Sequence, residues 1–459
     1  MAGIGFELRR ILQRGTLLSL LGAYGYAGVI SSGPWVLSIL GILAVGLLSA
    51  AVAGTAQQVT QFQVSVTWLI ALSLIITGPF QLAYTRFAAD RMFEKRNDLV
   101  LPNYQSVQLT VTWVSGLGGL LAAILLFPGE SVAYRLLMVA ALVLLSNIWI
   151  ATILLSGLKH HKTIVLLYGI GYGVSVLASL GLVQLGLAGM LAGFVLGQAV
   201  LLAGMLGLII REFPADRFIG FEFYRRDQHF RSLMWTGLAY NLAIWIDKFM
   251  FWLWPETSQQ IIGPLRASLI YDLPIFLAYL SIIPGMAVFL LRLETDFVDY
   301  YDSFYNAVRE GATLAMIERY RNGMVESARL GLFEIFKIQA IAALLVIVAS
   351  EALLGWLGIS PLYAPLLHIM VIGAGLQVVL LGILNVFFYL DRRRLALVTV
   401  TAFLLLNALF TAITLQLGPE YFGYGYAGAL LVVCVGALLL LDRVFENLEY
   451  ETFMLQRNA

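Results

Sequence analysis

Long apolar runs fill most of the chain and are separated by short polar or charged connections. A hydrocarbon layer about 30 Å thick is crossed by roughly 20 apolar residues in helical form. The runs are continuously apolar rather than alternating, which favours helices over a barrel. The pattern predicts an all-α integral membrane protein with 12 transmembrane helices, near residues 19–50, 62–85, 104–127, 132–157, 163–183, 187–211, 232–254, 267–291, 331–357, 362–390, 395–417 and 424–442.

The composition agrees with this pattern and excludes several classes of protein. Of 459 residues, 60% are hydrophobic and 12% are charged, about half the roughly 25% of an ordinary soluble domain. A soluble enzyme is therefore excluded. The net charge of +1 gives no reason to expect a nucleic-acid partner. The single cysteine, Cys434, excludes a disulfide framework and a cysteine-based metal site.

Lysine and arginine predict the orientation in the bilayer, because connections on the cytoplasmic side carry most of them. One set of connections holds 25 of the 28 basic residues, and the alternate set holds only Arg135 and Arg266 near its rims. Lys248 lies within a span. Both termini are therefore expected on the cytoplasmic side, in agreement with an even number of spans.

The N-terminal run resembles a signal peptide only superficially. Three arginines precede it, yet the apolar stretch from Thr16 to Ala50 is far longer than the apolar core of a signal peptide. We interpret it as a retained span. Residues 1–18, where apolar residues alternate with arginines, are expected to form an interfacial segment.

A weak internal repeat predicts two pseudo-symmetric six-helix lobes. Gly78-Pro79 near the end of the second run corresponds to Pro284-Gly285 in the eighth, and both are followed by an arginine. The predicted parts are an N-lobe at 19–225 (spans 1–6), a C-lobe at 226–445 (spans 7–12) containing a cytosolic segment at 292–330, and a cytosolic tail at 446–459.

Three ionisable residues within the predicted spans are the first candidates for function, because such side chains are costly in a membrane. They are Asp247 and Lys248 in the seventh span and Asp272 at a similar depth in the eighth. Asp247 or Asp272 could contact sugar hydroxyls or a coupling cation in a central cavity. Alternatively, Lys248 pairs with Asp272 to hold two helices together, and Asp247 is hydrogen-bonded locally.

Motifs along the whole chain resemble those of PelG-type inner-membrane transporters of the Pel exopolysaccharide system. The N-terminal motifs are Gly3-Ile4-Gly5-Phe6, Leu8-Arg9-Arg10, Ala23-Tyr24-Gly25, Ser32-Gly33-Pro34-Trp35, Gly78-Pro79, Thr85-Arg86 and Ala89-Asp90. The later ones are Tyr271-Asp272, Pro274, Phe276-Leu277-Ala278-Tyr279-Leu280, Ile283-Pro284, Met286-Ala287, Phe289, Glu294-Thr295 and Phe297. That family is placed in the multidrug/oligosaccharidyl-lipid/polysaccharide exporter superfamily, whose members have twelve spans in two lobes.

The resemblance implies a bacterial inner-membrane protein with a polysaccharide substrate and three kinds of partner. These are other membrane subunits, a cytosolic glycosyltransferase that uses nucleotide sugars, and a subunit that senses cyclic di-GMP. It also directs attention to the first two helices of each lobe, which face each other in this superfamily. Hydroxyl and amide groups with flat aromatic faces suit a sliding sugar chain, and the candidates there are Tyr24, Ser31, Ser32, Trp35, Gln81, Thr85, Asn241 and Trp245.

Two further features have both a structural and a functional interpretation. Gly33-Pro34, Gly78-Pro79, Pro274 and Pro284 could break helices beside a cavity, or simply kink them. The segment 292–330 alternates charged and aromatic residues and is expected to be an amphipathic docking helix rather than an acidic metal motif. The sequence contains no Walker motif, metal-binding histidine pair or nucleophile with a paired base, so neither enzyme activity nor a cofactor is expected.

Three hypotheses for function follow. The first is transport of an amino-sugar-rich exopolysaccharide of the Pel type across the cytoplasmic membrane within a synthase-export complex. The second is a cation-coupled multidrug exporter, in which Asp247 or Asp272 would titrate. The third is a membrane scaffold that anchors and activates a glycosyltransferase but conducts nothing.

Overall fold

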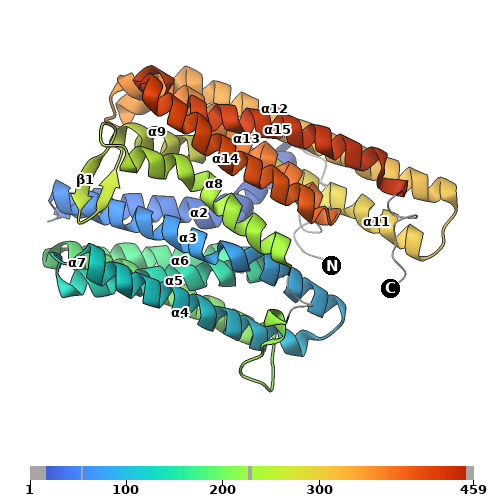
Figure 1. The fold of residues 1–459 in the computed structure, drawn as a ribbon, viewed down its shortest axis with the longest axis horizontal. Helices are drawn as coiled ribbons and strands as arrows, with labels where there is room; N and C mark the ends of the chain where they lie inside the picture. The colour runs from blue at the N-terminus through green and yellow to red at the C-terminus, as the bar shows by residue number, and fades with distance from the viewer. Residues whose placement is uncertain (1–16, 53–54, 159, 226–229, 451–459) are drawn as a thin grey trace. The chain divides into compact units, whose positions relative to one another are not determined.

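The computed structural model describes residues 17–52, 55–158, 160–225 and 230–450 (Figure 1). Almost all of the expected interfacial segment 1–18 and the end of the tail 446–459 lie outside them. The chain divides into two compact units. The continuous unit is Gly33–Leu269, and the split unit combines Met1–Ser32 with Ile270–Ala459. The lobes expected at 19–225 and 226–445, and the sequence repeat behind them, stay predictions.

The continuous unit is a group of packed helices with one small hairpin of strands. Helix α2 (Leu17–Val52) begins in the split unit and ends here. The other helices are α3 (Ala56–Phe93), α4 (Val100–Leu126), α5 (Val132–Gly157), α6 (His161–Gly181), α7 (Gly186–Glu212) and α8 (Arg231–Leu253). Strands β1 (Gln259–Ile262) and β2 (Leu265–Ala267) pair antiparallel, with Gln259 opposite Ala267.

The split unit contains the remaining helices and one segment of unusual geometry. Its helices are α9 (Leu269–Leu280), α10 (Ile283–Leu291), α11 (Val298–Arg309), α12 (Leu314–Trp356), α13 (Ala364–Tyr389), α14 (Arg393–Leu417) and α15 (Tyr424–Glu446). A six-residue π-helix, η5 (Arg292–Phe297), joins α10 to α11. The segment 292–330 is thus a helical hairpin rather than a single helix, because α11 turns back onto the start of α12.

Helices occupy all twelve predicted apolar runs, which confirms a mostly helical, multi-pass architecture. Among the described residues, 11 helices are long and apolar enough to cross a membrane. Helix α8 is absent from these 11. Its 23 residues are sufficient in length, but Asn241, Asp247 and Lys248 lower its hydropathy. The most polar predicted span is therefore also the one that carries two of the ionisable candidates.

Helix α4 illustrates why these helices suit a bilayer. Its buried face carries Val111, Ser115 and Gly119 at four-residue spacing. The opposite face is apolar but exposed, with Trp113, Leu117, Leu121 and Leu125. In a soluble protein the exposed face of a helix is polar. Here both faces are apolar, and the buried one is distinguished by its small residues, as is common where membrane helices pack closely.

Proline does not interrupt most of the helices in which the sequence predicted either a break or a kink. Helices α2, α3 and α9 continue through Pro34, Pro79 and Pro274 respectively. Only Pro284 lies at a break, because it occupies the first turn of α10 directly after the end of α9. The first turn tolerates proline, since the amide hydrogen there has no partner within the helix.

The connection between α7 and α8 is attached to the start of α4. Asn103 Oδ1 accepts a hydrogen bond from the Phe223 amide at 2.8 Å, and Asn103 Nδ2 donates to Glu222 Oε2 at 2.9 Å. Burial raises the pKa of the Glu222 carboxyl, but a backbone hydrogen bond, the Asn103 amide and the charges of Arg225 and Arg217 outweigh it. The pKa is therefore lowered, and the carboxylate form stabilises the attachment.

Candidate functional site

A stripe of hydrogen-bonding side chains runs along the face of α3. Ser73, Thr77, Gln81 and Thr85 are four residues apart, so they share one face of the helix. Gln81 Nε2 donates to Thr77 Oγ1 at 2.9 Å, and the Thr77 and Thr85 hydroxyls donate to backbone carbonyls four residues earlier. Trp149 of α5 donates to Ser73 Oγ at 2.9 Å. We call these four residues the polar stripe.

Helix α8 lies directly against this region of α3, and two glycines make the contact possible. A Cβ atom on Gly237 would come within 2.1 Å of the Gly78 carbonyl oxygen, and one on Gly78 within 2.8 Å of the Gly237 oxygen. The close approach brings Asn241 of α8 to Gln81 of α3, with Nδ2 and Oε1 3.4 Å apart. Two of the predicted site residues from distant parts of the sequence therefore meet.

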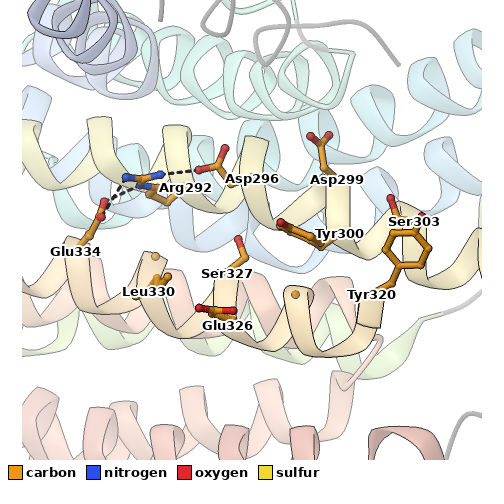
Figure 2. Close-up of a pocket in the computed structure, with 12 residues that line it drawn as sticks. Arg292, Asp296, Asp299, Tyr300, Ser303, Tyr320, Glu326, Ser327, Leu330 and Glu334 are labelled. Carbon is orange, nitrogen blue, oxygen red and sulfur yellow. Dashed lines mark hydrogen bonds and ion pairs between the residues drawn. The ribbon is translucent and has the colours of Figure 1, made fainter. Parts of the chain in front are cut away.

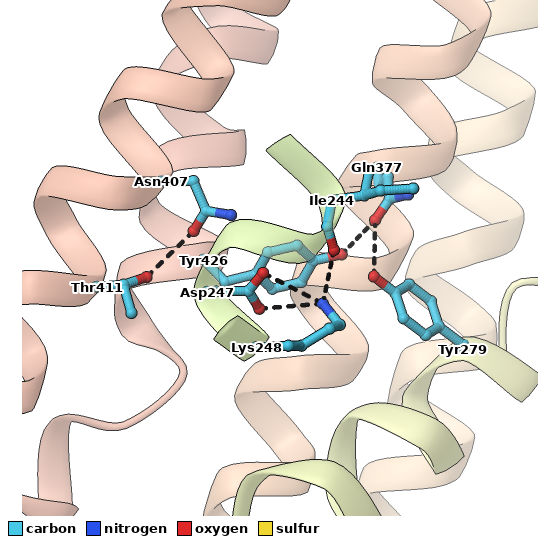
Figure 3. Close-up of polar contacts among 8 residues, drawn as sticks. All are labelled: Ile244, Asp247, Lys248, Tyr279, Gln377, Asn407, Thr411 and Tyr426. Carbon is cyan, nitrogen blue, oxygen red and sulfur yellow. Dashed lines mark hydrogen bonds and ion pairs between the residues drawn. The ribbon is translucent and has the colours of Figure 1, made fainter. Parts of the chain in front are cut away.

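Asp247 and Lys248 form a buried ion pair with each other (Figure 3). The Lys248 Nζ lies 3.1 Å from Asp247 Oδ2, and the side chains are 5% and 0% exposed. Lys248 also donates to the Ile244 carbonyl oxygen at 2.9 Å. Adjacent helical residues point about 100° apart, but the long lysine stem folds back far enough to bridge that angle. The pairing of Lys248 with Asp272 stays a prediction.

Aromatic rings surround the C-terminal half of α8. Trp252 is 2% exposed and packs on Trp68 of α3 with ring centroids 4.7 Å apart. Trp245 lies 6.0 Å from the Trp252 ring, and Lys248 Nζ lies 5.9 Å from the Trp245 centroid. The Trp245 indole nitrogen is buried and has no hydrogen-bond partner among the residues that the structure describes. Trp252 is therefore a packing residue, whereas Trp245 retains an unused donor.

The other predicted site residues are mostly engaged within their own helices. The hydroxyls of Ser31 and Ser32 donate to the carbonyl oxygens of Ala27 and Gly28, one turn earlier in α2. Tyr24 is partly buried against an apolar cluster from α2 and α10. Asp272 lies in the first turn of α9. There the positive end of the helix dipole stabilises a carboxylate. Trp35 is half-buried.

The split unit has its own neutral polar contacts, drawn in the same close-up (Figure 3). Gln377 Oε1 of α13 accepts hydrogen bonds from Tyr279 of α9 at 3.4 Å and from Tyr426 of α15 at 2.5 Å. On α14, the Thr411 hydroxyl donates to Asn407 Oδ1 at 3.2 Å. Amides and hydroxyls are thus hydrogen-bonded in the interior of each unit.

A charged cavity of about 660 Å³ lies between the η5–α11 segment and α12 (Figure 2). At one end the Arg292 guanidinium makes a two-pronged contact with Glu334, with Nε–Oε2 2.6 Å and Nη2–Oε1 3.1 Å. Its Nη1 donates to Asp296 at 2.8 Å. Asp299, Tyr300, Ser303, Tyr320, Glu326 and Ser327 continue the lining. The cavity belongs entirely to the split unit.

One comparison identifies the family to which these features belong. A sequence model of the exopolysaccharide exporter (EPS-E) family PelG matches residues 1–453. The chain belongs to the PelG exopolysaccharide exporter family. No curated protein matches this PelG-family chain in sequence.

Solved structures share the fold of this PelG-family member at low sequence identity. An outward-facing multidrug resistance MATE family transporter of the MOP superfamily matches with a TM-score of 0.68 and 13% identity, over 93% of this chain and 96% of the other. A mutant of the Vibrio cholerae MATE transporter VcmN has a TM-score of 0.61 and 12% identity, over 93% and 98%. A MOP superfamily transporter from Pyrococcus furiosus has a TM-score of 0.61 and 13% identity, over 93% and 96%. The fold is that of a MATE-like transporter.

Several residues of the candidate site in this PelG-family member were not among the sequence-based candidates. Ser73 and Thr77 precede Gln81 and Thr85 at the same four-residue spacing, so that periodicity could have included them. Trp149 and Gly237 carried no such signal, because their roles depend on contacts with α3 over long distances in sequence.

Proposed function

We propose that this chain moves an exopolysaccharide across the cytoplasmic membrane, with the facing sides of α3 and α8 contributing to the path. The full-length family match supports the substrate class, and the MATE-like fold supports transport. The observation that carries the choice of path is the contact between Asn241 and Gln81, because it joins the polar stripe to the face of α8 that also bears Trp245.

The chemistry of this face suits a neutral or hydroxyl-rich polymer. The amide and hydroxyl side chains of this face are hydrogen-bonded to each other. They can replace these bonds by hydrogen bonds to sugar hydroxyls at little cost in free energy. The unused indole N–H of Trp245 can donate to a sugar oxygen, and its ring offers a flat apolar surface. Asp247 is already neutralised by Lys248, so we assign this pair to holding α8 in shape rather than to binding a coupling cation.

The proposed topology has twelve membrane crossings with both termini in the cytoplasm. The proposed location is the inner membrane of a bacterial cell. Helix α8 would be the twelfth crossing, despite its lower hydropathy. A membrane interior tolerates a paired aspartate and lysine when both face protein rather than lipid, and both side chains are almost completely buried. The distribution of basic residues between connections supports the orientation.

The proposed context is a synthase-export complex. A cytosolic glycosyltransferase would supply the polymer, and other membrane subunits, including one that senses cyclic di-GMP, would complete the assembly. These partners are the ones that the resemblance to PelG-type transporters implies, and the family match supports the polysaccharide substrate.

A deletion strain tests the transport function. In cells that make the polymer, removing this chain should abolish secreted polymer, and the wild-type chain supplied in trans should restore it. Normal secretion without the chain would contradict the proposal. A panel of cationic drugs tested on the same strains separates the alternatives, since a multidrug exporter would change drug resistance while leaving secretion intact.

A scaffold would give a different result in the same strains. Bulky substitutions on α3 or α8 would leave secretion unaffected as long as the complex assembles. In a transporter, the same substitutions would stop secretion while the complex remained assembled. Assembly is measured by co-purification of the glycosyltransferase activity with the membrane.

A further inference from the structure

The eighth predicted span is broken into two half-helices. Helix α9 ends at Leu280 and α10 begins at Ile283, so only residues 281 and 282 connect them. Pro284 has no amide hydrogen to donate to the Leu280 carbonyl oxygen, four residues earlier. The break therefore interrupts the helical hydrogen-bond ladder near the middle of the span.

A side chain from α12 completes the first turn of α10. The Gly285 amide would pair with Ser281 in a continuous helix, but it donates to Gln339 Oε1 at 3.0 Å. Gln339 is 3% exposed, and a Cβ on Gly285 would lie 2.5 Å from its Oε1 atom. Gln339 also borders Gly375 of α13, where a Cβ would lie 3.5 Å from its Nε2 atom. Gln339 therefore packs against two glycines and fixes the start of α10.

The two half-helices differ in how firmly they pack. Six of the nine residues of α10 are buried, and this helix lies along α12. Only four of the 12 residues of α9 are buried, and α9 packs along no described helix as closely as α10 packs along α12. Few buried contacts are typical of segments with low local stability. Any movement about the break is therefore expected in α9 rather than in α10.

The last turn of α9 is joined to α13 by a long hydrogen bond. Tyr279 donates to Gln377 Oε1 at 3.4 Å, which is longer than an ordinary hydroxyl hydrogen bond, whereas Tyr426 donates to the same oxygen at 2.5 Å (Figure 3). Gln377 keeps this shorter bond when Tyr279 moves away. Separation of α10 from Gln339 would instead leave the buried Gly285 amide without an acceptor, which is costly.

We propose that α9 is a gate that turns about residues 281–282 during transport, and that Gln339 is the positioning residue that keeps α10 fixed. The proposal rests on the transport function and topology proposed above, in which α9 is the outer half of its span. Helix α9 is about 18 Å long, so a turn of about 20° moves its far end by about 6 Å. The hydrogen bonds within each half-helix stay intact in this motion, because the ladder is already interrupted.

Distances between spin labels test the motion in the full chain in nanodiscs, in a Cys434→Ala background. One pair joins the far end of α9 to an exposed position on α12, Ile270→Cys with Leu345→Cys. The matched pair joins α10 to the same position, Met286→Cys with Leu345→Cys. The first pair should show two distances about 5 Å or more apart, and the second pair a single distance. Distributions of equal width for the two pairs would contradict the gate.

Restoring the missing amide tests whether transport uses the motion. Pro284→Ala allows the half-helices to join, so the α9 pair should collapse to one distance and most secreted polymer should be lost. The unfolding temperature should stay at or above the wild-type value, because alanine suits a helix better than proline. Pro274→Ala is the matched control, because α9 already continues through Pro274. It should leave the distances and secretion unchanged.

A different result at Pro284 would overturn the gate. If Pro284→Ala collapses the distances but secretes polymer like the wild type, transport does not use the motion. If secretion falls only in proportion to a loss of folded chain, the proline has a structural role alone.

Two variants at Gln339 test the positioning role. Gln339→Leu removes the acceptor of the Gly285 amide, so the α10 pair should broaden and secretion should fall. Gln339→Glu keeps an acceptor oxygen on a side chain of the same length, so it should keep the α10 pair narrow and retain secretion. An unchanged α10 distance in Gln339→Leu would contradict the role.

The label distances do not depend on polymer transport. If the deletion strain secretes polymer normally, the transport function fails, while the distances still decide whether α9 moves against α10. If the two pairs do not differ, the gate fails and the transport function stands.

Discussion

Helix α8 and the α11–α12 hairpin use charged residues in opposite ways. In the first, one aspartate and one lysine neutralise each other at 0% and 5% exposure, and the surrounding polar groups are neutral. In the second, Arg292 and its two acidic partners are 24–43% exposed and border a cavity. A buried ion pair is shielded from solvent, whereas a partly exposed cluster is open to water and to mobile ions.

The largest expected effect comes from breaking the buried pair. Asp247→Leu leaves Lys248 without its counter-ion inside the protein, which should cost about 3–5 kcal/mol in stability. The double variant Asp247→Leu with Lys248→Met removes both charges and should recover most of that loss. The measurement is the unfolding temperature in detergent, with membrane abundance as a second readout. If the double variant is as unstable as the single one, the pair has a role beyond mutual neutralisation.

A smaller effect is expected at the glycine contact between α3 and α8. Gly237→Ala places a methyl group where the Gly78 carbonyl now lies, so the helices must separate at a cost of about 1–3 kcal/mol. Gly436→Ala is the matched control, because a Cβ there meets nothing within 4 Å. Thermal unfolding should distinguish the two. Similar curves for both variants would show that α3 and α8 are not in contact at this point.

The smallest expected effect is a difference between the two regions in how the loss of stability depends on salt concentration. Arg292→Gln removes a partly exposed network and should cost about 1 kcal/mol at low ionic strength. The difference from wild type should shrink as salt is raised, because mobile ions screen exposed charges. The cost of Asp247→Leu should remain unchanged over the same range. A salt-insensitive cost at Arg292 would mean that this cluster is closed to solvent like the buried pair.

The sequence predicted the helices well because a span requires a long apolar run, a signal that is local. All twelve predicted runs are helical, and the polar stripe of α3 lies in the predicted second span. The ion pair of Asp247 with Lys248 was not predicted, because helix geometry separates adjacent Cβ atoms and says nothing of a flexible lysine stem. The π-helix at Arg292–Phe297 also had no sequence signature.

Contacts between distant segments account for most of what could not be predicted at the site. Gln81 and Asn241 were both candidates, but only the close approach of Gly78 and Gly237 brings them together. The hairpin cavity depends on α11 folding back on α12, which places Tyr300 on Gly323. The expectation of a single docking helix at 292–330 missed that reversal, and with it the two walls of the cavity.

The central claim is that the α3–α8 face conducts the polymer, and secretion by point variants tests it most directly. Gln81→Leu combined with Asn241→Leu replaces two buried amides by apolar groups of similar size, so folding should survive. Gln416→Leu, at an exposed position on α14, is the matched control. Secreted polymer is measured per unit of chain in the membrane. We predict a loss of tenfold or more for the double variant and no loss for the control; wild-type secretion by a double variant of normal abundance would contradict the claim.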